Sequence, residues 1–196
     1  EAVEKSDLIF ICVGTPTKKN SQDVELKYVF SAINEIVKLA KSKKILITKS
    51  TVPIGTGDKI EKIIKRKRKK NIEVISNPEF LREGEAVRDF RFPDRIVVGS
   101  NNPKIFKIVK KLYQPLLNKG AKFFTTSRRG SELIKYASNA FLATKITFIN
   151  ELANLCEKTG INIEDISLGI GSDSRIGSRF LRAGPAYGGS CFPKDT

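Results

Sequence analysis

LIFICV (residues 8–13), followed at once by GTPT (residues 14–17), is the stretch that decides the predicted fold. All six residues of the first run are apolar, without the alternation that marks a strand with one solvent-facing side. A second run, ILIT at residues 45–48, is almost as apolar. Strands of this kind are covered by helices on both faces, so the pattern predicts a parallel sheet.

Short apolar runs alternate with longer amphipathic ones over the first 125 residues, which indicates repeated strand and helix units. The predicted strands are residues 7–13, 44–49, 72–76, 95–99 and 122–125, and the predicted helices are 24–40, 57–69, 103–117 and 130–158. We therefore expect the α/β class: part of a doubly wound, parallel, Rossmann-like sheet, followed by a long helix and the start of a helical central domain.

Each of the first three predicted strands runs into a turn that contains proline. A residue before proline is held in extended geometry, so these strands end sharply. The carboxyl ends of parallel strands lie at one edge of a sheet, where ligands bind. We expect Thr15, Thr51 and Glu79 to converge at this edge. The alternative for any single turn is that threonine and proline are ordinary turn residues.

The composition excludes several kinds of catalytic site. The sequence has 196 residues and no histidine, so a Ser-His-Asp triad, a Cys-His pair and imidazole-bound metals are excluded within it. Any base must be Glu, Asp, Lys or Cys. Cys12, Cys156 and Cys191 are an odd number at wide spacing, which fits neither a disulfide framework nor a metal cluster. We expect reduced thiols, no metal, and core packing for Cys12 and Cys156.

The apolar runs are too short to cross a bilayer, and no signal peptide opens the sequence. These features predict a cytoplasmic protein without a membrane partner. The sequence also lacks methionine and opens on EAVEK, which resembles the end of a helix. We interpret it as an internal fragment of a longer protein.

A formal net charge of +15 and the run KRKRKK at residues 65–70 raise the possibility of nucleic-acid binding. However, Ile60, Ile63 and Ile64 form an apolar stripe, so the basic run is expected to be the exposed last turn of a helix. Lysine is spread along the whole chain, without the interleaved aromatic residues that stack on bases. We expect no nucleic-acid partner; a basic binding module without catalysis stays the alternative from another functional class.

Two candidate catalytic residues lie in the predicted long helix. Lys135 and Asn139 are four residues apart, so they project from the same helix face. An ammonium and a carboxamide side by side can stabilise an oxyanion. A solvated polar strip is the alternative.

Cys191 is the candidate nucleophile. It follows Gly188-Gly189-Ser190, which permits close approach by a ligand, and it precedes Pro193, which suits the first turn of a helix. A helix start and the neighbouring Lys194 both favour the thiolate. Asp195 is near enough in sequence to serve as a base or hydrogen-bond partner.

Six motifs carry a resemblance to the UDP-glucose/GDP-mannose dehydrogenase family, in its UDP-glucose 6-dehydrogenase branch. They occur in family order over nearly the whole sequence: GTPT (14–17), STVPIGT (50–56), NPEFLREG (77–84), PDRIVVG (93–99), SRIGSRFL (174–181) and YGGSCFPKD (187–195). The resemblance implies oxidation of a sugar primary alcohol to a carboxylate with two NAD in succession. UDP-glucose is the implied substrate, in nucleotide-sugar metabolism that feeds polysaccharide biosynthesis; GDP-mannose and UDP-N-acetylmannosamine are the alternatives.

The resemblance also implies catalytic roles. Cys191 would trap the aldehyde as a thiohemiacetal, which becomes a thioester, and Lys135 and Asn139 would stabilise the oxyanions. Glu79 would manage protons and the hydrolytic water, and Thr51 would help to place that water. Asp195 would act beside the nucleophile.

Binding residues follow from the same motifs. The positions implied to contact NAD are Thr15, Ser50, Thr51, Glu83 and Lys194. The positions implied to bind the sugar nucleotide are Glu79, Phe80, Leu81, Lys135, Asn139, Arg182, Tyr187, Gly188 and Gly189. Arg175 would reach the sugar nucleotide of a neighbouring subunit, so the resemblance implies a homodimer or a larger homo-oligomer.

Parts of the family pattern are missing from the sequence. Gly55-Thr56-Gly57 and Gly169-Ile170-Gly171 both lack the third glycine of the dinucleotide fingerprint. We therefore expect residues 1–126 to be the carboxyl-terminal part of an NAD-binding domain without its first βαβ unit. Residues 127–196 would be the central helix and the substrate and dimerisation domain, without a carboxyl-terminal nucleotide-binding domain. On this interpretation the isolated fragment is inactive.

Overall fold

The computed structural model describes residues 1–19, 21, 23–69, 71–185 and 195. The chain forms two compact units, Glu1–Lys135 and Tyr136–Thr196. The predicted domain boundary between residues 126 and 127 stays a prediction.

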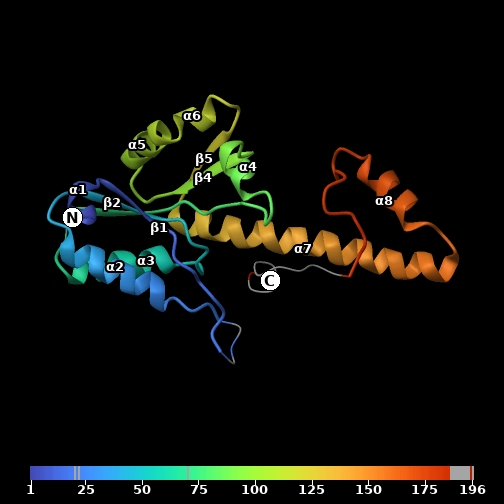
Figure 1. Ribbon diagram of the computed structural model, residues 1–196, viewed down its shortest axis with the longest axis horizontal. Helices are drawn as coiled ribbons and strands as arrows, with labels where there is room; N and C mark the ends of the chain where they lie inside the picture. The colour runs from blue at the N-terminus through green and yellow to red at the C-terminus, as the bar shows by residue number, and fades with distance from the viewer. Residues whose placement is uncertain (20, 22, 70, 186–194, 196) are drawn as a thin grey trace. The chain divides into compact units, whose positions relative to one another are not determined.

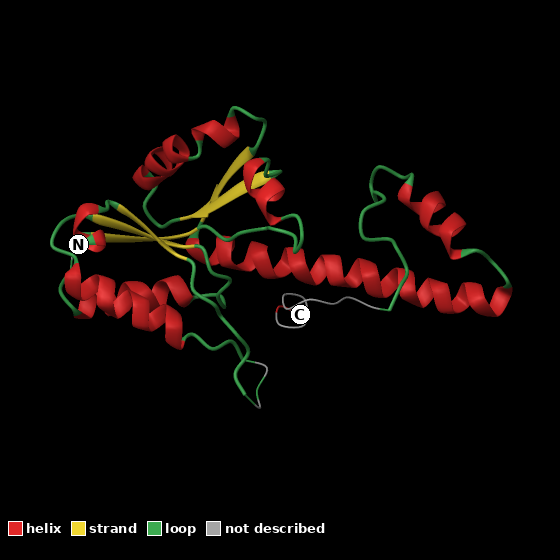
Figure 2. Ribbon diagram, viewed as in Figure 1, coloured by secondary structure: helices red, strands yellow, loops and turns green. Residues whose placement is uncertain are grey.

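The first unit is built on a sheet of five strands in the order β1-β2-β3-β4-β5 (Figures 1 and 2). The strands are β1 (Leu8–Ile11), β2 (Lys44–Thr48), β3 (Ile72–Ser76), β4 (Arg95–Gly99) and β5 (Lys122–Thr126). The helices between them are α1 (Ala2–Lys5), α2 (Lys27–Leu39), α3 (Thr56–Arg66), α4 (Ala86–Arg91), α5 (Lys104–Leu112) and α6 (Gln114–Leu117). The predicted α/β, Rossmann-like fold is confirmed.

Successive residues of the strands point into two cores, one on each face of the sheet. Leu46 packs with Ile33 of α2 and Ile60 of α3, whereas Ile47 packs with Ile105 of α5 on the opposite face. Figure 1 shows α2 and α3 below the sheet and α5 and α6 above it. Helices on both faces explain why these strands are apolar throughout.

One strand pair departs from the predicted parallel arrangement. β1-β2, β2-β3 and β4-β5 are parallel, but β3 and β4 are antiparallel and meet at Ser76 and Gly99. Parallel neighbours need a long crossover, usually a helix that packs on the sheet. The connection here carries only α4, which has six residues and none buried, so the chain returns in the opposite direction.

Two smaller predictions were also wrong. The helix expected over residues 103–117 is two helices, α5 and α6, because Pro115 lies in the first turn of α6, where a helix tolerates proline. Cys12 was expected in a strand of the core, but β1 ends at Ile11 and the Cys12 side chain is exposed. Cys156 is buried, as expected.

Helix α7 (Arg128–Thr159) begins in the first unit and continues into the second, which also contains α8 (Ile163–Gly171). The predicted helix end is confirmed, since Gly160 follows α7 with a φ of 72°, in the left-handed region that favours glycine. Within the second unit, Ser167 donates a hydrogen bond to the Leu181 carbonyl at 2.6 Å. This bond ties α8 to the segment that follows it.

Candidate functional site

The ends of β1 and β2 are joined by hydroxyl groups. Thr15 Oγ1 donates a hydrogen bond to the Thr51 carbonyl at 2.9 Å. Ser50 Oγ donates to the Val13 carbonyl at 2.6 Å. Two of the three residues expected to converge, Thr15 and Thr51, are therefore in contact at the carboxyl edge of the parallel strands.

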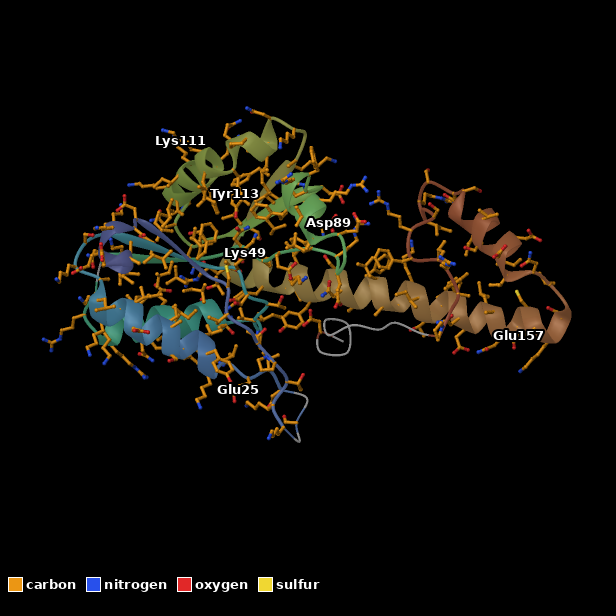
Figure 3. The ribbon with its side chains drawn as sticks, in the orientation of Figure 1. Glu25, Lys49, Asp89, Lys111, Tyr113 and Glu157 are labelled. Atoms are coloured by element: carbon orange, nitrogen blue, oxygen red, sulfur yellow. The ribbon has the colours of Figure 1, made fainter. Side chains whose placement is uncertain are left out.

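The turn after β3 is anchored by the buried amide of Asn77. Its Nδ2 donates to the Val97 carbonyl at 2.8 Å, and its Oδ1 accepts the hydroxyl of Tyr113. Lys49 Nζ, at the end of β2, donates to the same Oδ1 at 3.3 Å. Lys49 and Tyr113, labelled in Figure 3, approach to 5.9 Å between the ammonium and the ring centroid. Residues at the end of β2, in β4 and at the junction of α5 and α6 thus fix one turn.

Glu79, the third residue expected at this edge, forms an ion pair with Lys135. The Lys135 ammonium, with only 4% of its side chain exposed, lies 3.2 Å from Glu79 Oε1. It also lies 5.5 Å from the centroid of the Phe80 ring. The guanidinium carbon of Arg95 lies 4.1 Å from the same centroid. Because Lys135 is buried and ion-paired, the solvated-strip interpretation is wrong for this residue.

The second unit holds the other candidate pair. Asn139 Nδ2 donates a hydrogen bond to Asp195 Oδ2 at 2.7 Å, and both residues are buried. An amide that points its NH₂ group at a carboxylate is oriented as a donor. The solvated strip is therefore wrong for Asn139 as well.

The remaining predicted site residues are less enclosed. Leu81, Glu83 and Arg182 are exposed. Arg175 is exposed too, and its guanidinium binds Asp173 at 2.6 Å. The predictions for Tyr187, Gly188, Gly189, Cys191 and Lys194 lie outside the described residues.

The glycines of Gly55-Thr56-Gly57 have a different role from a phosphate-binding turn. The backbone N–H groups of Gly55 and Gly57 donate to the two carboxylate oxygens of Glu132, at 2.6 and 2.8 Å. The positive end of α3, where an anion binds readily, is thus occupied by a side chain of α7. Burial raises the pKa of Glu132, against the lowering effect of these two hydrogen bonds.

Sequence reasoning missed Lys49, Asn77, Tyr113 and Glu132. A signal existed for Lys49, because a lysine at the end of an almost wholly apolar strand is shielded by the same helices that cover the strand. Asn77 stands in the quoted NPEF turn but was not singled out. Tyr113 and Glu132 act over long sequence distances, which spacing does not reveal.

Among the described residues, no group of three or more acidic or cysteine side chains is arranged to hold a metal ion. In the same part of the chain, no helix combines the length and apolar character that a membrane span requires.

Two family models match the chain. Residues 1–117 match the NAD binding domain of the UDP-glucose/GDP-mannose dehydrogenase family, and residues 129–196 match its central domain. Together they cover nearly all of the sequence.

The curated relatives carry one activity in their names. The chain is 54% identical to a UDP-glucose 6-dehydrogenase of Rhizobium meliloti, over 100% of the chain and 45% of the relative. It is 46% identical to a UDP-glucose 6-dehydrogenase of Bacillus subtilis, over 100% of the chain and 42% of the relative. The chain therefore spans about half the length of the curated relatives it matches.

Solved structures agree with the fold. A UDP-glucose dehydrogenase from Pyrobaculum islandicum superposes with a TM-score of 0.91 at 37% identity, over 99% of the chain and 45% of that structure. A GDP-mannose dehydrogenase from Pseudomonas aeruginosa superposes with a TM-score of 0.82 at 33% identity, over 99% and 46%.

The described residues fit part of NAD. Thr15 and Ser50 each donate a hydrogen bond to a carbonyl, which leaves the lone pairs of their oxygens available to accept hydrogen bonds from ribose hydroxyls. Their place at the carboxyl edge is where Rossmann-like folds bind dinucleotides. Gly55 and Gly57 do not form the glycine turn that binds the pyrophosphate of NAD, because their N–H groups already donate to the Glu132 carboxylate.

Proposed function

Because the chain belongs to the UDP-glucose/GDP-mannose dehydrogenase family, we propose that the protein containing it oxidises UDP-glucose to UDP-glucuronate with two NAD. The observation that carries the proposal is the ion pair of the buried Lys135 with the half-buried Glu79 at the carboxyl edge of the sheet. An ammonium and a carboxylate held side by side can stabilise an oxyanion and accept a proton at the same reacting carbon. The relatives' names favour UDP-glucose over the other nucleotide sugars.

NAD, when bound, supplies the hydride acceptor for both oxidations, alcohol to aldehyde and thiohemiacetal to thioester. In the first oxidation the Glu79 carboxylate takes up the proton of the alcohol hydroxyl and then passes it to solvent. Between the two oxidations, the Cys191 thiolate adds to the aldehyde carbon; a carbon–sulfur bond forms and the carbonyl oxygen takes the negative charge. Lys135 and Asn139 donate hydrogen bonds to this oxygen. The ammonium of Lys135 and the carboxamide of Asn139 stabilise the oxyanion as hydrogen-bond donors, without giving up a proton.

Hydrolysis completes the reaction. Water adds to the thioester carbon while Glu79 takes up a proton from it, and the Thr51 hydroxyl helps to place that water. The carbon–sulfur bond then breaks, which releases the carboxylate and returns the Cys191 thiolate. Asp195, which follows Cys191 by four residues in the sequence, orients the Asn139 amide through their 2.7 Å hydrogen bond.

The test uses the full-length enzyme, meaning a protein of its relatives' length that contains this chain. We expect two NADH per UDP-glucose consumed, little free aldehyde, and no acid from Cys191→Ala. GDP-mannose and UDP-N-acetylmannosamine are offered in parallel, and faster oxidation of either would reassign the substrate. One NADH per sugar, or a Cys191→Ala enzyme that still makes acid at the normal rate, would overturn the covalent mechanism.

We also propose that the protein is a homodimer or a larger homo-oligomer. Phe141, Phe148 and Leu155 are exposed on α7 at spacings of seven residues, close to two helical turns, so they form one apolar stripe. Sedimentation of Phe148→Ser should give a smaller species than the parent. Phe90→Ser, which removes an equally exposed phenylalanine from α4, is the control and should leave the assembly unchanged.

A further inference from the structure

Lys49 is a partly buried cation that the proposed reaction does not use. It directly follows β2, and its Nζ donates to Asn77 Oδ1 at 3.3 Å and to the Pro78 carbonyl at 3.5 Å. Both acceptors belong to the turn that leads into Glu79. The lysine at the end of one strand thereby holds the turn at the end of the next.

The rest of that turn is held by neutral groups. The backbone N–H of Asn77 donates to the Thr48 carbonyl at 2.9 Å, and its side-chain amide donates to the Val97 carbonyl. The Tyr113 hydroxyl donates a hydrogen bond to Asn77 Oδ1. Burial raises the pKa of Tyr113 to about 12, so the phenol keeps its proton at neutral pH. Of the groups named here that bind the Asn77-Pro78 turn, Lys49 is the one that carries a positive charge.

Three charged or titratable groups act on the Lys49 ammonium besides the Tyr113 ring. Glu79 and, more weakly, Cys12 favour the charged form, whereas Lys135 disfavours it. Burial has the largest effect and lowers the pKa of Lys49 to about 8. The side chain is therefore mostly cationic at neutral pH and loses its charge only slightly above it.

We propose that Lys49 is a positioning residue, which holds the Asn77-Pro78 turn and shares with Lys135 the compensation of the Glu79 carboxylate. The inference rests on the proposed function for the role of Glu79 in proton transfer. Lys49 acts through that carboxylate and the turn that carries it. Its loss should therefore slow the chemical steps more than it weakens binding of the sugar nucleotide.

The test compares three variants of the full-length enzyme. Lys49→Met removes the charge and the donors, and we expect kcat to fall by up to about 10²-fold with little change in KM. Lys49→Arg keeps the positive charge and the hydrogen-bond donors, so its kcat should lie between those of Lys49→Met and the parent. Its guanidinium stays charged at high pH, so any fall in turnover above about pH 8 in the parent should move to higher pH.

Lys44→Met is the matched control. Lys44 opens the same strand and is fully buried, but its Nζ donates to the Glu4 carbonyl at 3.0 Å, at the other end of β2. If Lys49 were only a structural residue, both methionine variants would change stability and neither would change kcat. Unchanged kcat in a folded Lys49→Met enzyme would overturn the proposal.

A second measurement does not depend on turnover. The Lys49 ε-carbon is followed by NMR as a function of pH in the parent and in Glu79→Gln. Because the Glu79 charge raises the pKa of Lys49, we expect a lower pKa of Lys49 in the variant. An unchanged pKa would overturn the coupling of the two residues, whatever the activity. A lowered pKa of Lys49 in Glu79→Gln, together with a parent enzyme that fails to oxidise UDP-glucose, would instead support the coupling and refute the proposed function.

Discussion

The carboxylate of Glu132 accepts the backbone N–H of Gly57 at 2.8 Å, within the first turn of α3. Its other oxygen accepts the N–H of Gly55 at 2.6 Å. The first N–H groups of a helix have no partner within the helix, and a negative charge beside them is favourable. One side chain of α7 therefore satisfies a helix start that otherwise suits an anionic ligand.

Replacement of Glu132 should lower the stability of the first unit. Glu132→Ala leaves two backbone donors without their acceptor and should cost about 1–3 kcal/mol in the free energy of unfolding. Glu132→Gln keeps one acceptor oxygen and should cost less. Urea unfolding measures the difference. Glu157→Ala, which removes an exposed glutamate from the same helix (Figure 3), should stay within about 0.5 kcal/mol of the parent.

The same carboxylate should contribute to the pH dependence of stability. Burial raises the pKa of Glu132 above its ordinary value of 4.5 in the folded chain. Between the two pKa values the folded state binds more protons than the unfolded state, so the free energy of unfolding falls as pH rises through this window. Above the folded pKa this contribution is constant. Glu132→Gln should lose this part of the slope, and an identical slope in both proteins would contradict the assignment.

Gly99 should not tolerate a side chain. A Cβ there would lie 2.5 Å from Ser131 Cβ and 2.6 Å from the Ser127 carbonyl oxygen, where β4 meets the start of α7. Backbone cannot move aside cheaply, so Gly99→Ala should destabilise the protein by about 1–3 kcal/mol. Gly14→Ala is the control, because its Cβ would meet no atom within 4 Å. Equal melting temperatures for the two variants would argue against this close approach.

Most of the first unit could be predicted from the sequence because the runs that form β1 and β2 are apolar almost throughout and the later strands alternate with amphipathic helices. The antiparallel direction of β4 could not be predicted in this way. It depends on the connection between β3 and β4, in which α4 is short and buries no residue, and not on the residues of the strand itself. The pairing of Lys135 with Glu79 likewise joins residues far apart in sequence. Spacing along the helix placed Lys135 and Asn139 on one face but left open whether that face meets solvent.

Lys135 and Asn139 should matter for rate more than for cofactor binding. In the full-length enzyme, Lys135→Ala and Asn139→Ala should each slow turnover by about 10²–10³-fold, as for other oxyanion donors. Dissociation constants for NAD should change little. Lys158→Ala, an exposed lysine of the same helix, should keep the parental rate. Normal turnover in both Lys135→Ala and Asn139→Ala would remove the proposed oxyanion role.

The three thiols should differ in reactivity in the folded full-length enzyme. Cys156 is buried with 6% of its surface exposed, so it should react last with an alkylating reagent. Cys12 is exposed and competes with Cys191. The thiolate is the reactive form of cysteine, and the sequence predicts that Lys194 and a helix start favour the thiolate of Cys191, so we expect Cys191 to react first. Mass-spectrometric mapping at short times identifies the order, and Cys12→Ser removes the competitor. UDP-glucose should protect Cys191 and leave Cys12 reactive; early labelling of Cys12 with Cys191 unmodified would count against the proposed nucleophile.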